Sequence, residues 1–193
     1  ADVRATTFTA TIEGAFGAQG GGDKSIDTSV THLNVNTGAF SGSQWIDEID
    51  SLATLNLNAG TANITLTTGG TLLDGDSALD IQATTFTGAI NGNFGGAVAA
   101  DDAIDTAVTN LNINTSGANG SQWIDEANAL GSLNLDAGAG SITLTAGGMV
   151  LDGDTALDIR ANTFTGVNTG DFGAQGGGDN SIDTTVTNLN VDT

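Results

Sequence analysis

The chain repeats itself at a fixed interval of 78 residues, and this period restricts its possible folds more than any other feature. The seven residues GSQWIDE occur at Gly42–Glu48 and again at Gly120–Glu126, and 120 − 42 gives 78. At the same interval, LDGDSALDI at Leu73–Ile81 matches LDGDTALDI at Leu151–Ile159. No gap is needed to align the copies. A fixed period of this kind is the sequence signature of a repeat architecture.

A shorter motif recurs inside each copy, in the order Leu, Asn or Asp, aliphatic, polar, small. Its seven copies are spaced by 22, 24 and 32 residues and then by 22, 24 and 32 again, and they begin at Leu33, Leu55, Leu79, Leu111, Leu133, Leu157 and Leu189. Alternating apolar and polar residues are typical of a strand with one buried face. Stretches such as AGTA, TTGG and DGDS separate the motifs and contain turn residues. Helix signals are nearly absent, and the best candidate is WIDEIDSLATL, which starts at Trp45.

Short strands at these intervals predict an all-β fold, a parallel β-solenoid. We expect about three strands in each coil and about three coils in each repeat, which at about 4.8 Å per coil makes a repeat about 14 Å long. The single continuous solenoid covers residues 1–193, with a partial repeat at 1–43, a full repeat at 44–121 and a nearly full repeat at 122–193. Neither end coincides with a turn or a cap, which predicts a fragment of a longer array. The alternative fold is a string of β-sandwich domains.

The chain is strongly acidic, with 23 Asp and Glu residues against Arg4, Lys24 and Arg160, for a net charge of −20. This balance argues against nucleic acid and anionic membranes as partners, because both require Lys and Arg to neutralise phosphate. No apolar run approaches the roughly 20 residues of a membrane-spanning helix. The chain has no Cys, which excludes disulfides and thiolate metal sites.

The segments LNLNAGTANITLTTGG and LDIQATTFTG resemble the shafts of filamentous-haemagglutinin-type exoproteins and other giant repetitive bacterial surface proteins. The resemblance is one of style over the whole chain. It implies a right-handed parallel β-helix that is secreted and acts as an adhesin, stalk or matrix fibre. It also implies that any specific surface or glycan ligand binds at a tip that lies outside this sequence.

The two DGD sequences are the candidate metal sites. Their carboxylates, Asp74 and Asp76 in one copy and Asp152 and Asp154 in the other, could bind Ca²⁺, which prefers oxygen ligands. The competing interpretation is an Asp-Gly-Asp turn between two strands. No other cofactor is indicated.

Other residues give weaker signals. Trp45 and Trp123 could present an aromatic surface to a sugar or to a neighbouring fibre, or could simply cover a corner of a coil. His32 is the only histidine, and because the copies have Asn110 and Asn188 at its position, we expect a surface position. The adjacent acids Asp47 and Glu48 resemble the carboxylates of a polysaccharide-active β-helix enzyme only superficially, and no catalytic residue is predicted.

The sequence therefore predicts a non-catalytic, secreted structural protein that forms or extends an extracellular fibre or a cell-surface stalk. Its expected partners are other copies or repeats of the same protein. One alternative is a set of tandem β-sandwich adhesin domains that bind Ca²⁺ and a glycan or surface ligand. A minor alternative is a β-helix enzyme that acts on polysaccharides.

Overall fold

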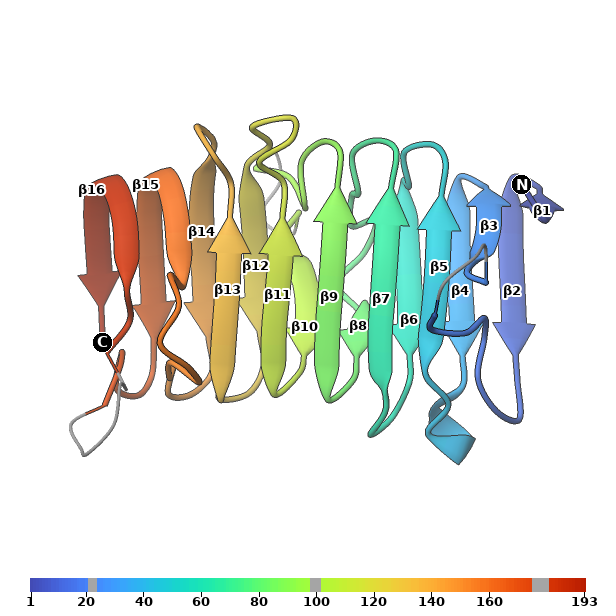
Figure 1. Cartoon of the computed structure of the whole chain (residues 1–193), viewed down its shortest axis with the longest axis horizontal. Coiled ribbons are helices and arrows are strands. Elements are labelled where there is room, and N and C mark those ends of the chain that lie inside the picture. The colour runs from blue at the N-terminus through green and yellow to red at the C-terminus, as the bar shows by residue number, and fades with distance from the viewer. Residues whose placement is uncertain (21–23, 98–101, 175–180) are drawn as a thin grey trace.

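A computed structural model describes residues 1–20, 24–97, 102–174 and 181–193, and it shows a β-solenoid of about eight turns. The chain winds as a flattened coil with two broad faces, and every strand pairs in parallel with a strand of the coil before or after it (Figure 1). The solenoid prediction is therefore confirmed, and the alternative of separate β-sandwich domains is wrong. Each coil contains two main strands where about three were expected.

Two columns of strands form the two faces. The first column contains β1 (Val3–Arg4), β3 (Ile26–Ser29), β5 (Gln44–Glu48), β7 (Asn63–Thr68), β9 (Thr85–Ile90), β11 (Asn110–Asn114) and β13 (Ser132–Asp136). The second contains β2 (Thr7–Thr11), β4 (His32–Asn36), β6 (Thr54–Asn58), β8 (Ile81–Gln82), β10 (Ile104–Ala107), β12 (Gln122–Glu126) and β14 (Ser141–Ala146). The last strands, β15 (Ile159–Asn168) and β16 (Thr184–Asp192), run from the first face onto the second.

The recurring Leu motif forms strands because its alternation matches the two sides of a sheet. In β6, Leu55 and Leu57 point inward and are 4% and 0% exposed, whereas Asn56 between them faces solvent. The segment that begins at Trp45, the best helix candidate, is instead β5 followed by a short connection to β6. The described residues contain one short 3₁₀ helix, η1 (Gly38–Phe40), in the connection between β4 and β5.

Equivalent inward positions stack directly on one another from coil to coil. On the first face, Ile64 pairs with Phe86, then Leu111 and then Leu133 in successive coils. These four side chains are at most 3% exposed. Because each coil buries its apolar side against its neighbours, the core is a continuous column along the solenoid axis.

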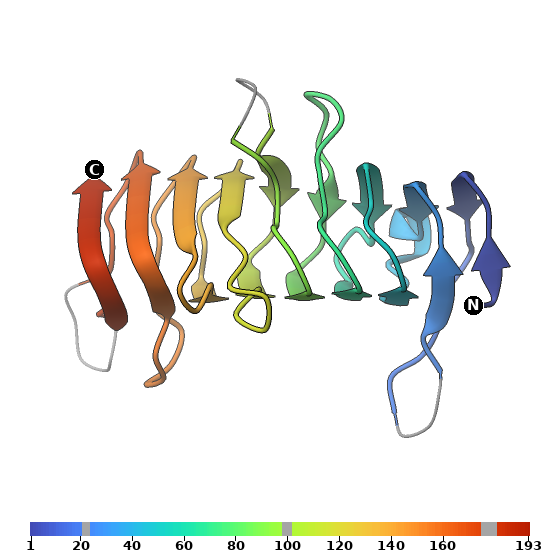
Figure 2. The same ribbon diagram turned by 90° about the horizontal axis from the view of Figure 1, so that it is seen from above.

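One 78-residue repeat spans three and a half coils in the structure, a refinement of the expected value of about three. Three steps along the first face lead from β5 through β7 and β9 to β11. The copy of β5 is β12, the strand that follows β11 in the chain, and it belongs to the opposite face. Consecutive copies of every motif therefore lie on opposite sides. Figure 2 shows this for the segments 73–79 and 151–157, which project in opposite directions.

Candidate functional site

The two DGD segments are loops that join the end of one strand to the next strand of the solenoid. The first loop connects β7 to β8 and the second connects β14 to β15. In the first, Oδ1 of Asp74 accepts a hydrogen bond from the backbone N–H of Asp76 at 2.9 Å. Oδ1 of Asp76 in turn accepts one from the N–H of Ala78 at 2.7 Å. Such side-chain contacts two residues ahead are those of an Asx-turn, so the turn interpretation of DGD describes the local structure well.

The four predicted metal-binding residues divide into a buried and an exposed pair. Asp74 and Asp152 are 8% and 4% exposed. Asp76 and Asp154 lie on the surface of the loops. Within the ranges that the structure describes, no group of three His, Cys, Asp or Glu side chains converges closely enough to hold a metal ion. The predicted Ca²⁺ ligands are therefore not gathered into a preformed cage.

Two further acids lie at the same loops, Asp80 and Asp158. Each is the last residue of its loop, and the two residues are only 4% and 3% exposed. Oδ2 of Asp80 accepts a hydrogen bond from the backbone N–H of Asp105 at 2.9 Å, which ties one coil to the next. Asp158 makes the same contact with the N–H of Asp183 at 2.7 Å. Sequence reasoning missed both residues, although the complete pattern DGD-x-x-x-D is present in each copy.

Burial of these two acids disfavours their ionised form. Loss of hydration raises the pKa of Asp80 to about 8. The negative charge of Asp74 raises this pKa further, whereas the hydrogen bond from the N–H of Asp105 lowers it. Loss of hydration likewise raises the pKa of Asp158 to about 7, and the neighbouring carboxyl of Asp152 adds to the effect. Each loop therefore contains a pair of buried carboxyl groups that repel one another when both are charged.

The repeated QWIDE strands place polar residues inside the solenoid and an aromatic residue outside. Trp123 is half-buried on the outer surface of β12, whereas Gln122 and Glu126 are 0% exposed. In β5, the equivalent Trp45 borders a shallow hollow that is also lined by Gln19 and Thr65. Sugar binding by the two tryptophans stays a prediction.

Glu48 and Glu126 are buried carboxyl groups that link neighbouring coils. Glu126 Oε2 accepts hydrogen bonds from Thr106 Oγ1 at 2.7 Å and from the N–H of Val108 at 3.2 Å, both in the preceding coil. Its Oε1 accepts one from the N–H of Asn128 at 2.9 Å. Glu48 makes the equivalent contacts with donors of its own coil and the preceding one. Since Asp47 faces outward in the same strand, the adjacent acids do not form a pair of facing carboxylates.

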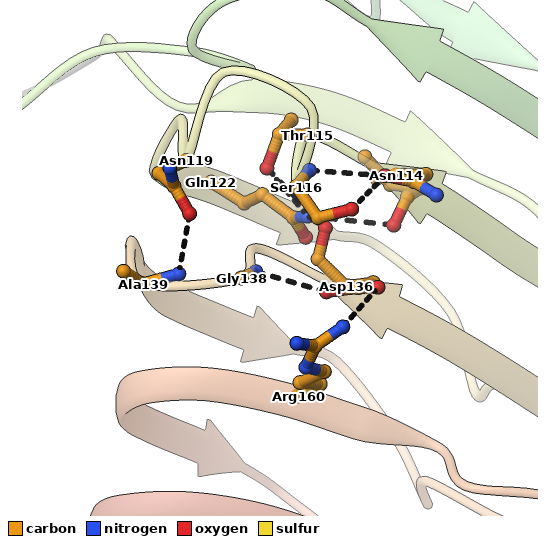
Figure 3. Close-up of polar contacts among 10 residues, drawn as sticks. Asn114, Thr115, Ser116, Asn119, Gln122, Asp136, Gly138, Ala139 and Arg160 are labelled. Atoms are coloured by element: carbon orange, nitrogen blue, oxygen red, sulfur yellow. Dashed lines mark hydrogen bonds and ion pairs between the residues drawn. The ribbon is translucent and has the colours of Figure 1, made fainter.

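The buried glutamine of each QWIDE strand holds the turn that precedes it. Gln122 Nε2 donates to Thr115 Oγ1 at 3.1 Å and to the backbone oxygen of Asp136 in the next coil at 3.2 Å (Figure 3). On the surface beside this network, Arg160 forms an ion pair with Asp136, with a distance of 3.5 Å between Nη1 and Oδ2.

The glycine that opens each GSQWIDE copy allows two coils to approach closely. A Cβ atom on Gly42 would overlap the carbonyl oxygen of Gly14, and one on Gly120 would overlap that of Gly92. The duplicated heptapeptide is therefore a structural unit in which the glycine, the glutamine and the glutamate each secure contacts between coils.

The lone histidine occupies the surface position that its copies predicted. His32 lies in β4 with its Nδ1 atom 2.9 Å from Oγ1 of Thr54 in the next coil. Its copy Asn110 accepts a hydrogen bond from Ser132 in the following coil at 3.0 Å. Both residues thus belong to ladders of polar side chains along the outside of the solenoid.

Comparison with known proteins does not place the chain in a family. No protein-family model matches it, and neither the curated proteins nor the solved structures include a significant match. In the part of the chain that the structure describes, no helix has the length and apolar character needed to cross a membrane.

Proposed function

We propose that this chain is a non-catalytic structural segment, the shaft of a secreted fibre or cell-surface stalk. The observation that carries the proposal is the regular stacking of its coils, in which strands from β1 to β16 are joined by parallel pairing into one sheet. A shaft of this kind separates the parts at its two ends by a fixed distance. The segment itself then needs no substrate.

The internal contacts support a stiff shaft. Backbone hydrogen bonds between coils combine with a continuous apolar column and with buried polar links such as those of Glu48 and Glu126. Repeat proteins of this type are stabilised mainly by contacts between neighbouring units. Bending the shaft would therefore require several of these contacts to break together.

The acidic surface and the resemblance to bacterial exoprotein shafts support a location outside the cell. With a net charge of −20, bare shafts repel one another, so close lateral packing requires cations between them. The charge therefore favours a stalk of single chains over a bundle, and self-association then occurs only in the presence of cations.

Electron microscopy of the protein isolated from its source cells tests this function directly. We expect fibres with a coil spacing of about 4.8 Å and an axial distance of about 17 Å for each repeat, because three and a half coils separate consecutive copies. Antibodies raised against the purified 193-residue chain should label these fibres on unpermeabilised source cells. Labelling only after permeabilisation, with a known intracellular protein as the control, would contradict an extracellular role.

A further inference from the structure

The carboxyl groups of Asp152 and Asp158 meet inside the second DGD loop without a cationic partner. Both side chains are more than nine-tenths buried. The two carboxyl groups lie close enough for the charge of Asp152 to disfavour the ionised form of Asp158. Over the described ranges, the one ion pair is that between Arg160 and Asp136, so no basic side chain neutralises this pair.

One oxygen of the pair lacks a hydrogen-bond donor. Oδ1 of Asp152 accepts from the N–H of Asp154 at 2.8 Å, and Oδ2 of Asp158 accepts from the N–H of Asp183 at 2.7 Å. In contrast, Oδ2 of Asp152 is fully buried and no donor among the described residues reaches it. A buried carboxylate oxygen without a partner is strongly destabilising, so this atom requires a cation, a proton or a buried water.

We propose that each DGD loop binds one Ca²⁺ ion through its two buried carboxylates, those of Asp152 and Asp158 in the second loop and those of Asp74 and Asp80 in the first. Ca²⁺ suits the loops because it accepts six to eight oxygen ligands in irregular geometry and retains water readily. The ion neutralises the repulsion between the two acids. This site does not depend on the proposed shaft function.

The limited number of protein ligands sets the strength of the site. Since no three acidic side chains converge among the described residues, water and backbone oxygens complete the coordination. The exposed carboxylate of Asp154 accepts a hydrogen bond from the N–H of Ala156 and lies close enough for its charge to raise the pKa of Asp158, so it adds negative potential at the site. We expect a dissociation constant of about 10⁻⁴ to 10⁻³ M, which is typical of extracellular calcium modules.

The first loop repeats the arrangement independently. Asp74 and Asp80 are both more than nine-tenths buried, and the contacts of Asp80 with the next coil and of Asp74 with its own loop match those of the second copy. The chain therefore contains two equivalent sites. Because the two loops project from opposite sides of the solenoid, the ions are bound on opposite faces (Figure 2).

Calorimetric titration of the 193-residue chain with CaCl₂ in mildly alkaline buffer tests the proposal, because ionised carboxylates bind the cation. We expect two ions per chain in the wild type and one ion per chain in the double variant Asp152→Asn/Asp158→Asn. The exposed Asp171→Asn variant, which also loses negative charge, should retain two. Titration with MgCl₂ should give at least tenfold weaker binding, because Mg²⁺ demands a regular octahedral shell.

A second measurement uses the wild type alone and remains decisive if the variant does not fold. Side-chain carboxyl ¹³C signals of the four buried acids should shift with Ca²⁺ and saturate, while that of Asp171 stays in place. Absence of saturable shifts up to about 10 mM Ca²⁺, ten times the weak end of extracellular affinities, would overturn the proposal. That result would mean that each pair only shares a proton.

Discussion

Replacement of Glu126 by alanine should loosen the solenoid at one defined place. The Glu126 carboxyl accepts hydrogen bonds from the Thr106 hydroxyl and from the N–H groups of Val108 and Asn128. In the variant, the hydroxyl can turn toward the backbone oxygen of Asp125, which lies 3.5 Å away. The buried N–H of Val108 is then left without an acceptor, whereas the N–H of Asn128, an exposed residue, can bond to water.

The magnitude follows from the hydrogen bonds that are lost. The unsatisfied buried donor of Val108 costs about 1–3 kcal/mol, and exchange of the Asn128 hydrogen bond for one to water costs at most about 0.5–1.5 kcal/mol. The loss of side-chain packing adds to this, although water that enters the cavity recovers part of it. We therefore expect Glu126→Ala to lower the local free energy of unfolding by about 2–4 kcal/mol. Glu126→Gln retains one acceptor oxygen and should cost less than half as much.

Hydrogen–deuterium exchange measures this effect where it occurs. The amides of Val108 and Asn128 should exchange about 100-fold faster in Glu126→Ala, since about 2.7 kcal/mol corresponds to two factors of ten at 1.36 kcal/mol each. The matched control is Asp125→Asn, which changes an exposed acid on the opposite side of the same strand. If the two variants exchange alike at these amides, the Glu126 contacts do not hold the coils together.

Three further predictions test other contacts. Gly120→Ala should destabilise the chain by more than 2 kcal/mol in chemical unfolding because its Cβ overlaps the preceding coil, whereas Gly117→Ala, with open space around it, should be nearly neutral. Burial raises the pKa of Glu126, so the folded state is favoured when this carboxyl group is neutral. The melting temperature of the wild type should therefore fall relative to that of Glu126→Gln as the pH rises from the ordinary pKa of glutamate through the raised pKa. A difference in melting temperature that stays constant with pH would refute this. Phe86→Ala should cost about 3–5 kcal/mol because Phe86 is 0% exposed, whereas Phe40→Ala should cost less than about 1 kcal/mol because Phe40 is 60% exposed, and equal losses would contradict the assigned core.

The sequence predicted the solenoid because its inward positions are mostly apolar. Leu55 and Leu57 alternate with asparagines, and both point into the core as this pattern indicates. QWIDE misleads the same reasoning, since its inward residues are Gln122 and Glu126 and its tryptophan lies at the outer surface. A pattern based on hydrophobicity alone cannot recognise a buried polar residue, because its burial depends on donors contributed by other coils.

The turn interpretation of the DGD segments is confirmed, but the sequence analysis recognised only half of the buried acids in these loops. Asp74 and Asp152 were recognised, and both are buried. Asp80 and Asp158 were missed because the Leu motif assigns them to the following strand, and their proximity to the loop acids depends on how the loop folds back. The number of coils in a repeat was equally inaccessible, because strands on the two faces have the same sequence pattern.

Because each repeat contains an additional half coil, the number of repeats sets the direction in which later segments face as well as the length of the solenoid. Gain or loss of one 78-residue unit by recombination would turn everything beyond it by about half a revolution, because each copy of a motif lies on the face opposite to the previous copy. Two units would restore the original direction. In the proposed shaft, even changes in the number of repeats would therefore preserve the direction of the segments beyond them, and odd changes would reverse it.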